Sequence, residues 1–245
     1  MDFIPFKTRK FLPPKDDLFG LLDQSLPALK EKDLVLITSK LVSIHQGRCV
    51  KITPDMTLKD KIRLIKKEAD GWLPQTPHGL AVKDLTLTPY AGVDRSNGKN
   101  HYILLPQKPH LFAKKIWTHL RNKYRLKNLG VVVTDSFCLP LRWGHMGISV
   151  GFWGFHPNYS YVGQPDIFGR KIVEANSNLV DALAAFGGVI MGEGNEQTPL
   201  LIVRGLDKIR FTSKSTLSEL KIPQGKSDLY APLLKVFKKT LNSSP

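Results

Sequence analysis

Two short apolar runs rich in β-branched residues, at positions 34–37 and 130–133, stand out along the chain. Continuous apolar runs of this length are typical of strands that are buried on both faces of a sheet. The first run leads into Thr38-Ser39 and the second into Thr134-Asp135-Ser136. Because loops at the ends of sheet strands commonly hold ligands, both strand ends are candidates for a functional site.

Helical periodicity appears in four other stretches. Apolar residues fall on one face of residues 57–70, 112–124 and 229–237, and of a stretch from the expected N-cap Ser177 through Phe186. The last stretch meets Gly187-Gly188 and leads into Met191-Gly192-Glu193-Gly194. Helices and strands in this irregular order imply an α+β (mixed α/β) fold with a mixed sheet.

At 245 residues the chain is long enough to bury a sizeable core of its own. We expect a single unit over residues 1–245, with any boundary between two lobes near residue 128. A Rossmann or P-loop domain is not expected, because no G-x-G-x-x-G follows a strand and Gly225-Lys226-Ser227 lacks the earlier glycine of a P-loop. We interpret that tripeptide as a surface turn.

The chain carries 36 Lys and Arg against 21 Asp and Glu, a formal net charge of +15. Such an excess attracts polyanions of any kind, whether nucleic acids or phosphorylated small molecules. The cations are dispersed, whereas nucleic-acid binders often concentrate them, so nucleic acid is not the expected partner. Cys49 and Cys138 are the only cysteines, and neither a signal peptide nor a membrane segment is apparent, which favours the cytoplasm.

Three acidic residues lie in small, turn-forming sequence: Asp94, Asp135 and Glu193. Magnesium in phosphoryl-transfer sites commonly binds one or two carboxylates, while phosphate and water fill its remaining positions. Together the three acids could hold two metal ions. Separately, each has an ordinary explanation, since Asp94 suits an Asx turn, Asp135 a cap and Glu193 a solvated surface.

Arginines offer cationic partners for a phosphate or a carboxylate, because the guanidinium group can bind either with two hydrogen bonds. The candidates are Arg142, Arg170 and Arg204. A structural ion pair is an equally good interpretation of Arg204. His145 is a candidate base, although a lone histidine is more often structural.

These segments, in this order, resemble the family of coenzyme F-420-0:L-glutamate ligases. The residues that carry the resemblance are Leu36-Ile37-Thr38-Ser39-Lys40, Gly47-Arg48, Ala91-Gly92-Val93-Asp94-Arg95-Ser96-Asn97, Val133-Thr134-Asp135-Ser136, Asp166-Ile167-Phe168-Gly169-Arg170, Met191-Gly192-Glu193-Gly194 and Val203-Arg204-Gly205. Each piece is weak alone, but the shared order and approximate spacing cover nearly the whole chain.

The resemblance implies a homodimeric ligase that uses GTP with magnesium or manganese, and often potassium, to phosphorylate an anionic acceptor's carboxylate. The amine of L-glutamate then displaces phosphate. Asp94 with Asp135 would bind one divalent ion, and Ser136 with Glu193 a second. Asp135 also counts among the catalytic residues, and Arg142 and Arg170 are our candidates for holding substrate carboxylates. The residues expected around the nucleotide are Leu12, Pro13, Ser39, Lys40, Asn97, Met191, Gly192, Glu193, Gly194 and Asn195.

Two departures from the family pattern keep alternatives open. Ile44 stands where the family has a lysine, and Phe137-Cys138-Leu139 follow Asp135-Ser136 where the family has a polar residue and then Gly-Arg. A folate or pteroate acceptor is one alternative, with an apolar pocket formed by Phe137, Cys138, Leu139, Trp143 and Trp153. The others are a nucleotide-binding homologue without turnover and a basic nucleic-acid-binding protein.

Overall fold

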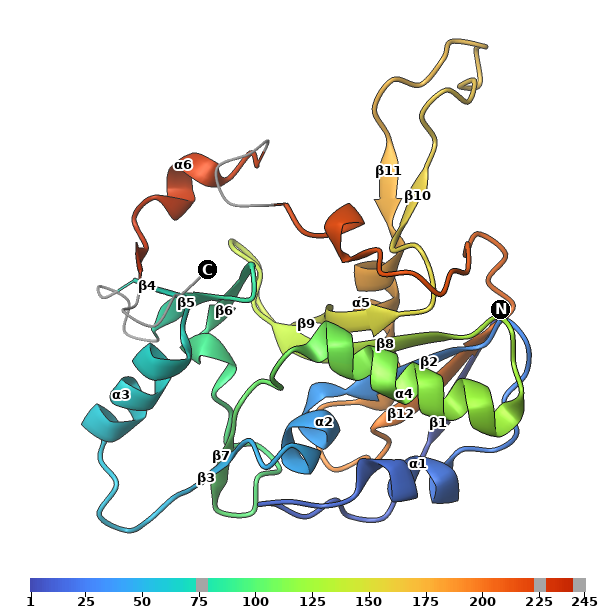
Figure 1. Ribbon diagram of the computed structural model, residues 1–245. Coiled ribbons are helices and arrows are strands. Elements are labelled where there is room, and N and C mark those ends of the chain that lie inside the picture. Colours follow the sequence, from blue (N-terminus) through green and yellow to red (C-terminus); the bar gives the residue numbers. More distant parts are fainter. Residues whose placement is uncertain (74–78, 223–227, 240–245) are drawn as a thin grey trace.

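The computed structural model describes residues 1–73, 79–222 and 228–239 (Figure 1). The segment Gly225-Lys226-Ser227, interpreted above as a surface turn, lies outside these residues. The helices are α1 (Leu18–Ser25), α2 (Ser39–His45), α3 (Leu58–Glu68), α4 (Pro109–Tyr124), α5 (Leu179–Met191) and α6 (Ala231–Leu234), with 3-10 turns η1 (Tyr90–Gly92) and η2 (Leu217–Glu219). The strands are β1 (Asp2–Phe6), β2 (Leu34–Thr38), β3 (Cys49–Lys51), β4 (Gly71–Trp72), β5 (Leu80–Lys83), β6 (Thr86–Pro89), β7 (His101–Ile103), β8 (Gly130–Phe137), β9 (Met146–Trp153), β10 (Asn158–Ser160), β11 (Asn176–Asn178), β12 (Leu200–Arg204) and β13 (Lys238–Lys239). These elements confirm the expected α+β class.

The central sheet has the strand order β1-β12-β2-β8-β9. β2 and β8 run parallel, whereas the other neighbouring strands are antiparallel. Alternate residues of β2 belong to opposite layers: Val35 and Ile37 share a core with α1, α2 and α4, and Leu34 and Leu36 share one with α5. Burial on both faces is the reason that this strand is continuously apolar.

The helices α4 and α5 pack directly against the backbone of the edge strand β9. A Cβ atom on Gly147 would come within 2.1 Å of the Ala184 carbonyl oxygen in α5. A Cβ atom on Gly151 would come within 2.5 Å of the Pro109 carbonyl carbon in α4. The two glycines therefore set how closely both helix layers approach the sheet.

The helices predicted over 57–70 and 112–124 are confirmed as α3 and α4. The helix predicted from Ser177 is confirmed as α5, but its N-cap is Asn178, whose side chain accepts the Asp181 N–H group at 3.1 Å. No helix in the described part of the chain is both long and apolar enough to cross a membrane.

The helix predicted over 229–237 was too long. α6 ends at Leu234, and the apolar side chains of Leu229, Leu233 and Val236 are mostly exposed. Short helices depend on burying an apolar face, so a stripe without a packing partner does not extend the helix.

A smaller lobe contains α3, β4, β5, β6 and η1 together with β13, and it has its own core. Its sheet has the order β13-β4-β5-β6, and the buried residues of its cluster are Ile65, Ala69, Ala81, Ala91, Val93 and Leu104. Arg48 joins the lobe to the main body, because its guanidinium pairs with Glu68 and its Nε donates to the Leu105 carbonyl at 3.1 Å. Residue 128 lies between α4 and β8. The lobe boundary expected near this residue stays a prediction.

A two-stranded arm formed by β10 and β11 projects from the main body (Figure 1). The turn at its tip is organised by Asp166, whose carboxylate accepts the N–H groups of Phe168 and Arg170, both at 2.9 Å. The side chains of Ile167 and Phe168 are almost fully exposed. The arm thus presents apolar groups that nothing in the described part of the chain covers.

Arg204, a candidate ligand-binding cation in the sequence, forms a structural ion pair instead. Its Nε and Nη2 atoms donate to the two carboxylate oxygens of Asp33, both at 2.7 Å. Asp33 is fully buried immediately before β2, and it also accepts the Lys30 N–H group at 2.8 Å. The pair joins β12 to the start of β2.

We predict that Arg204→Met lowers the free energy of unfolding by about 3–5 kcal/mol, because it leaves the buried Asp33 carboxylate without a counter-charge. Asp33→Asn should cost less, since the cation that remains is partly exposed and the amide oxygen can still accept the Lys30 N–H group. Urea unfolding of both variants measures which of them loses more free energy of unfolding. Equal losses, or a larger loss for Asp33→Asn, would contradict the prediction.

His110 is a buried histidine in the first turn of α4. Its side chain is packed between the rings of Phe152 and Trp153, with 5.0 Å between the ring centroids in each case. Nε2 lies 2.9 Å from the Ser215 hydroxyl, whereas Nδ1 has no hydrogen-bond partner among the described residues. Burial, with a smaller contribution from the charge of Lys221, lowers the pKa of His110 to about 4.

This depressed pKa predicts acid sensitivity. The unfolded chain binds the proton near its ordinary pKa of about 6.5, but the folded chain does not bind it until about pH 4, so stability falls as the pH drops through this window. The contribution lost between about pH 7 and about pH 5 is roughly 2 kcal/mol. We expect His110→Gln to remove that part of the pH dependence in urea unfolding. An unchanged difference between the two pH values would exclude His110 as its source.

Candidate active site

The parallel pairing of β2 with β8 brings two polar strand ends together. Its register places Thr38 opposite Thr134, so the residues that follow meet. The Ser39 hydroxyl donates to Asp135 Oδ2 at 2.7 Å, and the Ser136 N–H group donates to Oδ1 at 2.8 Å. The expectation that both strand ends belong to one site is consistent with this contact. However, Asp135 and Ser136 lie within β8, which continues to Phe137, and not in a loop.

Asp94 reaches the same place from the smaller lobe. The loop after η1 is held by a backbone bridge between Asp94 and Ile103. The Asp94 carboxylate accepts the N–H and the hydroxyl of Ser96, at 2.9 and 2.6 Å, and Oδ2 lies 2.6 Å from Lys40 Nζ. Desolvation raises the pKa of Asp94, but the charge and hydrogen bonds of Lys40 and Ser96 outweigh it, so the pKa lies below its ordinary value.

The pKa of Asp135 is shifted in the opposite direction, above its ordinary value. Burial raises the pKa of its carboxyl, and this effect exceeds the opposing hydrogen bonds from Ser39 and Ser136 and the positive charge of Lys40. The negative charge of Asp94 raises the pKa further. Two carboxylates that repel each other in this way form a place where added positive charge is favourable.

The donor set fits one of the two expected divalent ions. Asp94 and Asp135 offer carboxylate oxygens, with the Ser39 hydroxyl beside Asp135, and magnesium and manganese prefer such oxygen ligands. Glu193 stands apart: its side chain is 52% exposed, and its carboxylate lies 4.0 Å from His145 Nδ1. Within residues 1–73, 79–222 and 228–239, no three His, Cys, Asp or Glu side chains group closely enough to hold a metal. The second ion, at Ser136 and Glu193, stays a prediction.

The loop after α5 closes one side of the site. Asn97 Nδ2 donates to the Gly194 carbonyl at 3.1 Å, so the Asp94 loop and the 191–195 loop are in contact. Glu196 accepts the Gly194 N–H group at 2.8 Å, and a Cβ atom on Gly192 would come within 2.4 Å of its carboxyl carbon. Met191 is buried, and Asn195 is exposed. Glu196 is an organising residue of this loop that the sequence analysis missed.

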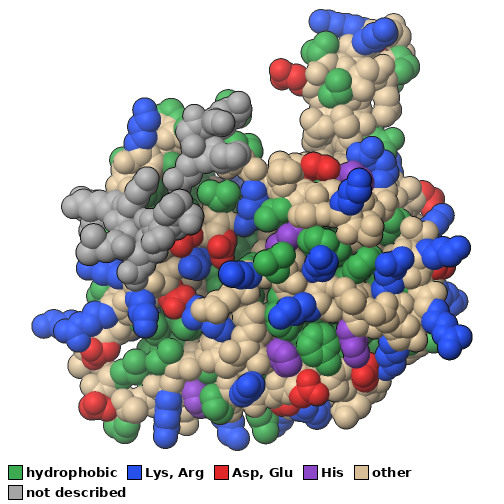
Figure 2. Space-filling view, viewed as in Figure 1, with side chains coloured by type: hydrophobic (Ala, Val, Ile, Leu, Met, Phe, Trp, Pro, Cys, Tyr) green, Lys and Arg blue, Asp and Glu red, His purple; other side chains and the backbone are tan. Residues whose placement is uncertain are grey.

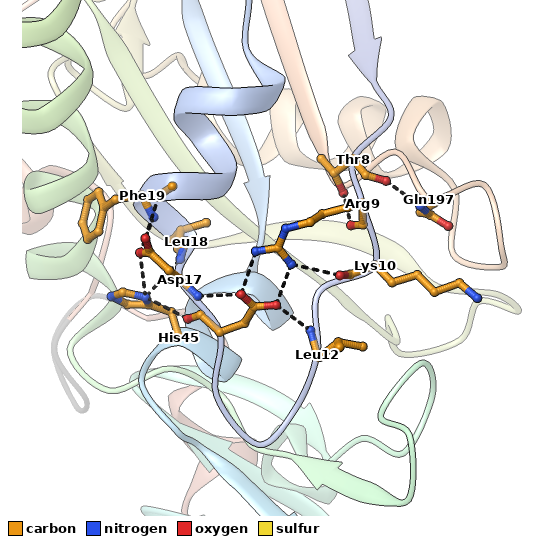
Figure 3. A network of polar contacts seen from close by, with 11 residues as sticks. Thr8, Arg9, Lys10, Leu12, Asp17, Leu18, Phe19, His45 and Gln197 are labelled. Carbon is orange, nitrogen blue, oxygen red and sulfur yellow. Dashed lines mark hydrogen bonds and ion pairs between the residues drawn. The ribbon is translucent and has the colours of Figure 1, made fainter.

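The loop that carries Leu12 and Pro13 is fixed by a polar network (Figure 3). Both carboxylate oxygens of Asp16 accept Arg9 at 2.7 Å, and one of them also accepts the Leu12 N–H group at 3.0 Å. The hydrogen bond from Arg9 outweighs desolvation and, with backbone donors, holds the pKa of Asp16 well below its usual range. The Leu18 N–H group donates to His45 Nδ1 at 3.1 Å, which ties α1 to the end of α2. This network was also missed, because none of its residues belongs to a recognisable motif.

Neither Arg142 nor Arg170 forms a hydrogen bond or ion pair with Asp135 among the described residues. Arg142 is exposed, and its guanidinium donates to the neighbouring Leu141 carbonyl at 3.0 Å. Arg170 lies at the tip of the projecting arm. Their roles toward substrate carboxylates stay predictions.

The residues that depart from the family pattern lie in both buried and exposed positions. Ile44 is buried and lies one helical turn after Lys40 in α2. Among the residues named for a folate-type acceptor, Phe137 and Trp153 are buried, whereas Cys138, Leu139 and Trp143 are exposed. The folate-type acceptor stays a prediction.

Sequence comparison finds relatives along most of the chain. A family model described as F420-0:Gamma-glutamyl ligase matches residues 8–205. The coenzyme F420:L-glutamate ligase of Methanopyrus kandleri is 29% identical over 218 residues, which cover 82% of this chain and 86% of the relative. The protein of the same name from Methanosarcina mazei is 29% identical over 210 residues (78% and 81%), and that from Methanocaldococcus jannaschii is 27% identical over 198 residues (72% and 77%). Since the family match runs through β2, the Asp94 loop, β8 and the loop after α5, the chain belongs to the F420-0:gamma-glutamyl ligase family.

Proposed function

We propose that this protein uses GTP to join L-glutamate to the carboxylate of an acceptor of the coenzyme F-420-0 type. The observation that carries the proposal is the convergence of Asp94 and Asp135 beside Lys40, in contact with the 191–195 loop. Family membership supports the amide-forming reaction, and the names of the relatives suggest the acceptor. GTP, the metal and the acyl-phosphate step are parts of the proposal.

The proposed reaction has two displacements. An acceptor carboxylate oxygen attacks the γ-phosphorus of GTP, the bond to the β–γ bridging oxygen breaks, and GDP leaves. The glutamate amine then attacks the acyl carbon, phosphate leaves with the bonding electrons, and the nitrogen loses a proton to complete the amide.

The residues of the site have distinct tasks in this scheme. Asp94 and Asp135 would hold magnesium or manganese, which when bound neutralises charge on the transferred phosphoryl group. Ser39 and the Ser136 N–H group orient Asp135. Asn97 holds the 191–195 loop, whose glycines allow backbone amides to approach the phosphates.

We also propose a homodimer in which the arm contributes to the contact. The exposed Ile167 and Phe168 at the arm tip support it, because apolar groups presented together on a projection commonly mark an interface. A nucleic-acid-binding role is not favoured by this geometry, since the two carboxylates of the site would repel a phosphate backbone.

Mass spectrometry of the reaction products tests the ligase. The mixture contains the protein, L-glutamate, manganese, GTP or ATP, and either F-420-0 or pteroate. We expect the mass of one glutamyl residue to be added to F-420-0 with GTP, and Asp135→Asn to slow this by about a hundredfold or more. The matched control is Asp207→Asn, an exposed acid outside the site, which should keep wild-type activity. Glutamate addition to pteroate but not to F-420-0 would show that the acceptor is of the pteroate type. No addition to either compound would reject the proposed ligase activity.

Light scattering tests the dimer. We expect the wild-type chain to have twice the monomer mass and the double substitution Ile167→Ser with Phe168→Ser to shift it toward the monomer, because each serine removes apolar contact area. Leu229→Ser removes an equally exposed apolar side chain far from the arm and should leave the mass unchanged. A monomeric wild type, or a dimer that tolerates the arm substitutions, would count against the arm as the interface.

A further inference from the structure

Lys40 contacts the acidic pair at a carboxylate oxygen of Asp94. Its Nζ lies 2.6 Å from Asp94 Oδ2 and donates to the Ser96 hydroxyl, also at 2.6 Å. Ser96 in turn donates to the same Asp94 oxygen at 2.6 Å. A full positive charge therefore rests on a carboxylate oxygen that a divalent ion at this site would use.

The main chain directs Lys40 to this position. α2 begins directly after β2, and the Thr38 N-cap hydroxyl accepts the Lys40 N–H group at 3.4 Å. The first two residues of the helix contact different carboxylates: Ser39 donates a hydrogen bond to Asp135, and Lys40 forms an ion pair with Asp94. The charge of Lys40 also acts on Asp135, where it opposes the larger effect of burial on the pKa.

The Lys40–Asp94 pair is placed so that it can open. The side chains are 27% and 47% exposed, and pairs at this exposure are held weakly because water screens them. An ammonium group and a divalent ion bound to one oxygen would lie close enough to repel each other strongly. Occupation of Asp94 Oδ2 by one cation therefore opposes its occupation by the other.

We propose that Lys40 is an exchangeable counter-ion, a positioning residue that competes with the divalent metal for Asp94 and turns to the nucleotide phosphates when the metal binds. This inference rests on the proposed function, in which Asp94 and Asp135 hold the metal. Before the metal binds, the ammonium group of Lys40 supplies positive charge beside the carboxylates. The bound metal ion then supplies that positive charge in its place. The phosphate-bearing nucleotide offers the released ammonium group a new partner.

Such an exchange couples the binding of the divalent metal to the binding of the nucleotide. A nucleotide phosphate that binds Lys40 removes the competitor from Asp94, so nucleotide strengthens metal binding, and by linkage the metal strengthens nucleotide binding. Without the lysine, the metal should bind more tightly alone and gain less from the nucleotide.

Equilibrium binding of Mn²⁺, followed by the electron paramagnetic resonance signal of the free ion, tests the exchange without any turnover. In the absence of nucleotide we expect Lys40→Met to bind Mn²⁺ about fivefold more tightly than wild type, because the competing ion pair is gone. Lys40→Gln should do the same, and its amide can still hydrogen-bond Ser96 if the methionine variant folds poorly. Lys40→Arg keeps the charge and should show no gain.

Lys99→Met is the matched control for net charge. Lys99 is an exposed lysine in the same loop as Asp94, and it lies outside the proposed machinery. Any long-range effect of losing one positive charge appears in this variant too, so the expected gain for Lys40→Met is measured relative to Lys99→Met. Adding GDP should tighten Mn²⁺ binding more in wild type than in Lys40→Met.

Unchanged or weaker Mn²⁺ binding in both Lys40→Met and Lys40→Gln overturns the inference, as does a gain equal to that of Lys99→Met. The glutamate-transfer assay separates this failure from failure of the proposed function. Transfer by wild type with no gain in either variant rejects only the exchange. A gain in both variants with no transfer by wild type rejects the ligase and supports the exchange.

Discussion

The parallel pairing of β2 with β8 is the constraint on which the site depends. Its register aligns Thr38 with Thr134, and the next residues, Ser39 and Asp135, are therefore in hydrogen-bond contact. A slip of one residue would turn Asp135 to the opposite face of the sheet, away from Ser39 and Lys40. Two-sided burial of both strands makes such a slip costly, because every apolar side chain would exchange its layer.

Charge balance links this strand pair to the rest of the molecule. The main body supplies Asp135 and Lys40, whereas Asp94 comes from the smaller lobe, whose core is separate. The Lys40–Asp94 pair and the Asn97–Gly194 contact therefore join elements that hydrophobic packing alone does not fix together. Lys and Arg side chains are dispersed over the face of the molecule drawn in Figure 2, in keeping with the net charge of +15. Such a field favours the approach of anionic substrates.

The sequence predicted those features that leave a local pattern. Strands β2 and β8 were recognisable from continuous apolar runs, and α3 and α4 from their amphipathic spacing. α6 was overestimated, because periodicity shows an apolar face but not whether anything packs on it. The position of Asp135 inside β8 was missed, since polar residues in a strand end resemble a loop when the partner strand is unknown.

The sequence indicated which residues are candidates for the site, but it did not indicate which of them contact one another. Asp94 and Asp135 stood in recognisable segments, yet the contact between Lys40 and Ser96 spans 56 positions and depends on how two lobes meet. The same limit explains Glu193, whose neighbours in the chain resemble a ligand loop while its side chain stands apart from the other acids. Glu196 and Asp16 act through backbone N–H groups, which no side-chain pattern reveals.

The placement of β12 between β1 and β2 has a consequence for synthesis on the ribosome. β1 pairs with β12 in a register that joins Asp2 to Arg204, so the first strand to emerge has no partner until the chain has been made through Arg204. The same late strand covers one edge of β2 and neutralises Asp33. A nascent chain that stops before Leu200 would leave two apolar strand edges and one buried charge unmatched. Such a fragment would be handled by chaperones and proteases and would not persist as a partly working enzyme.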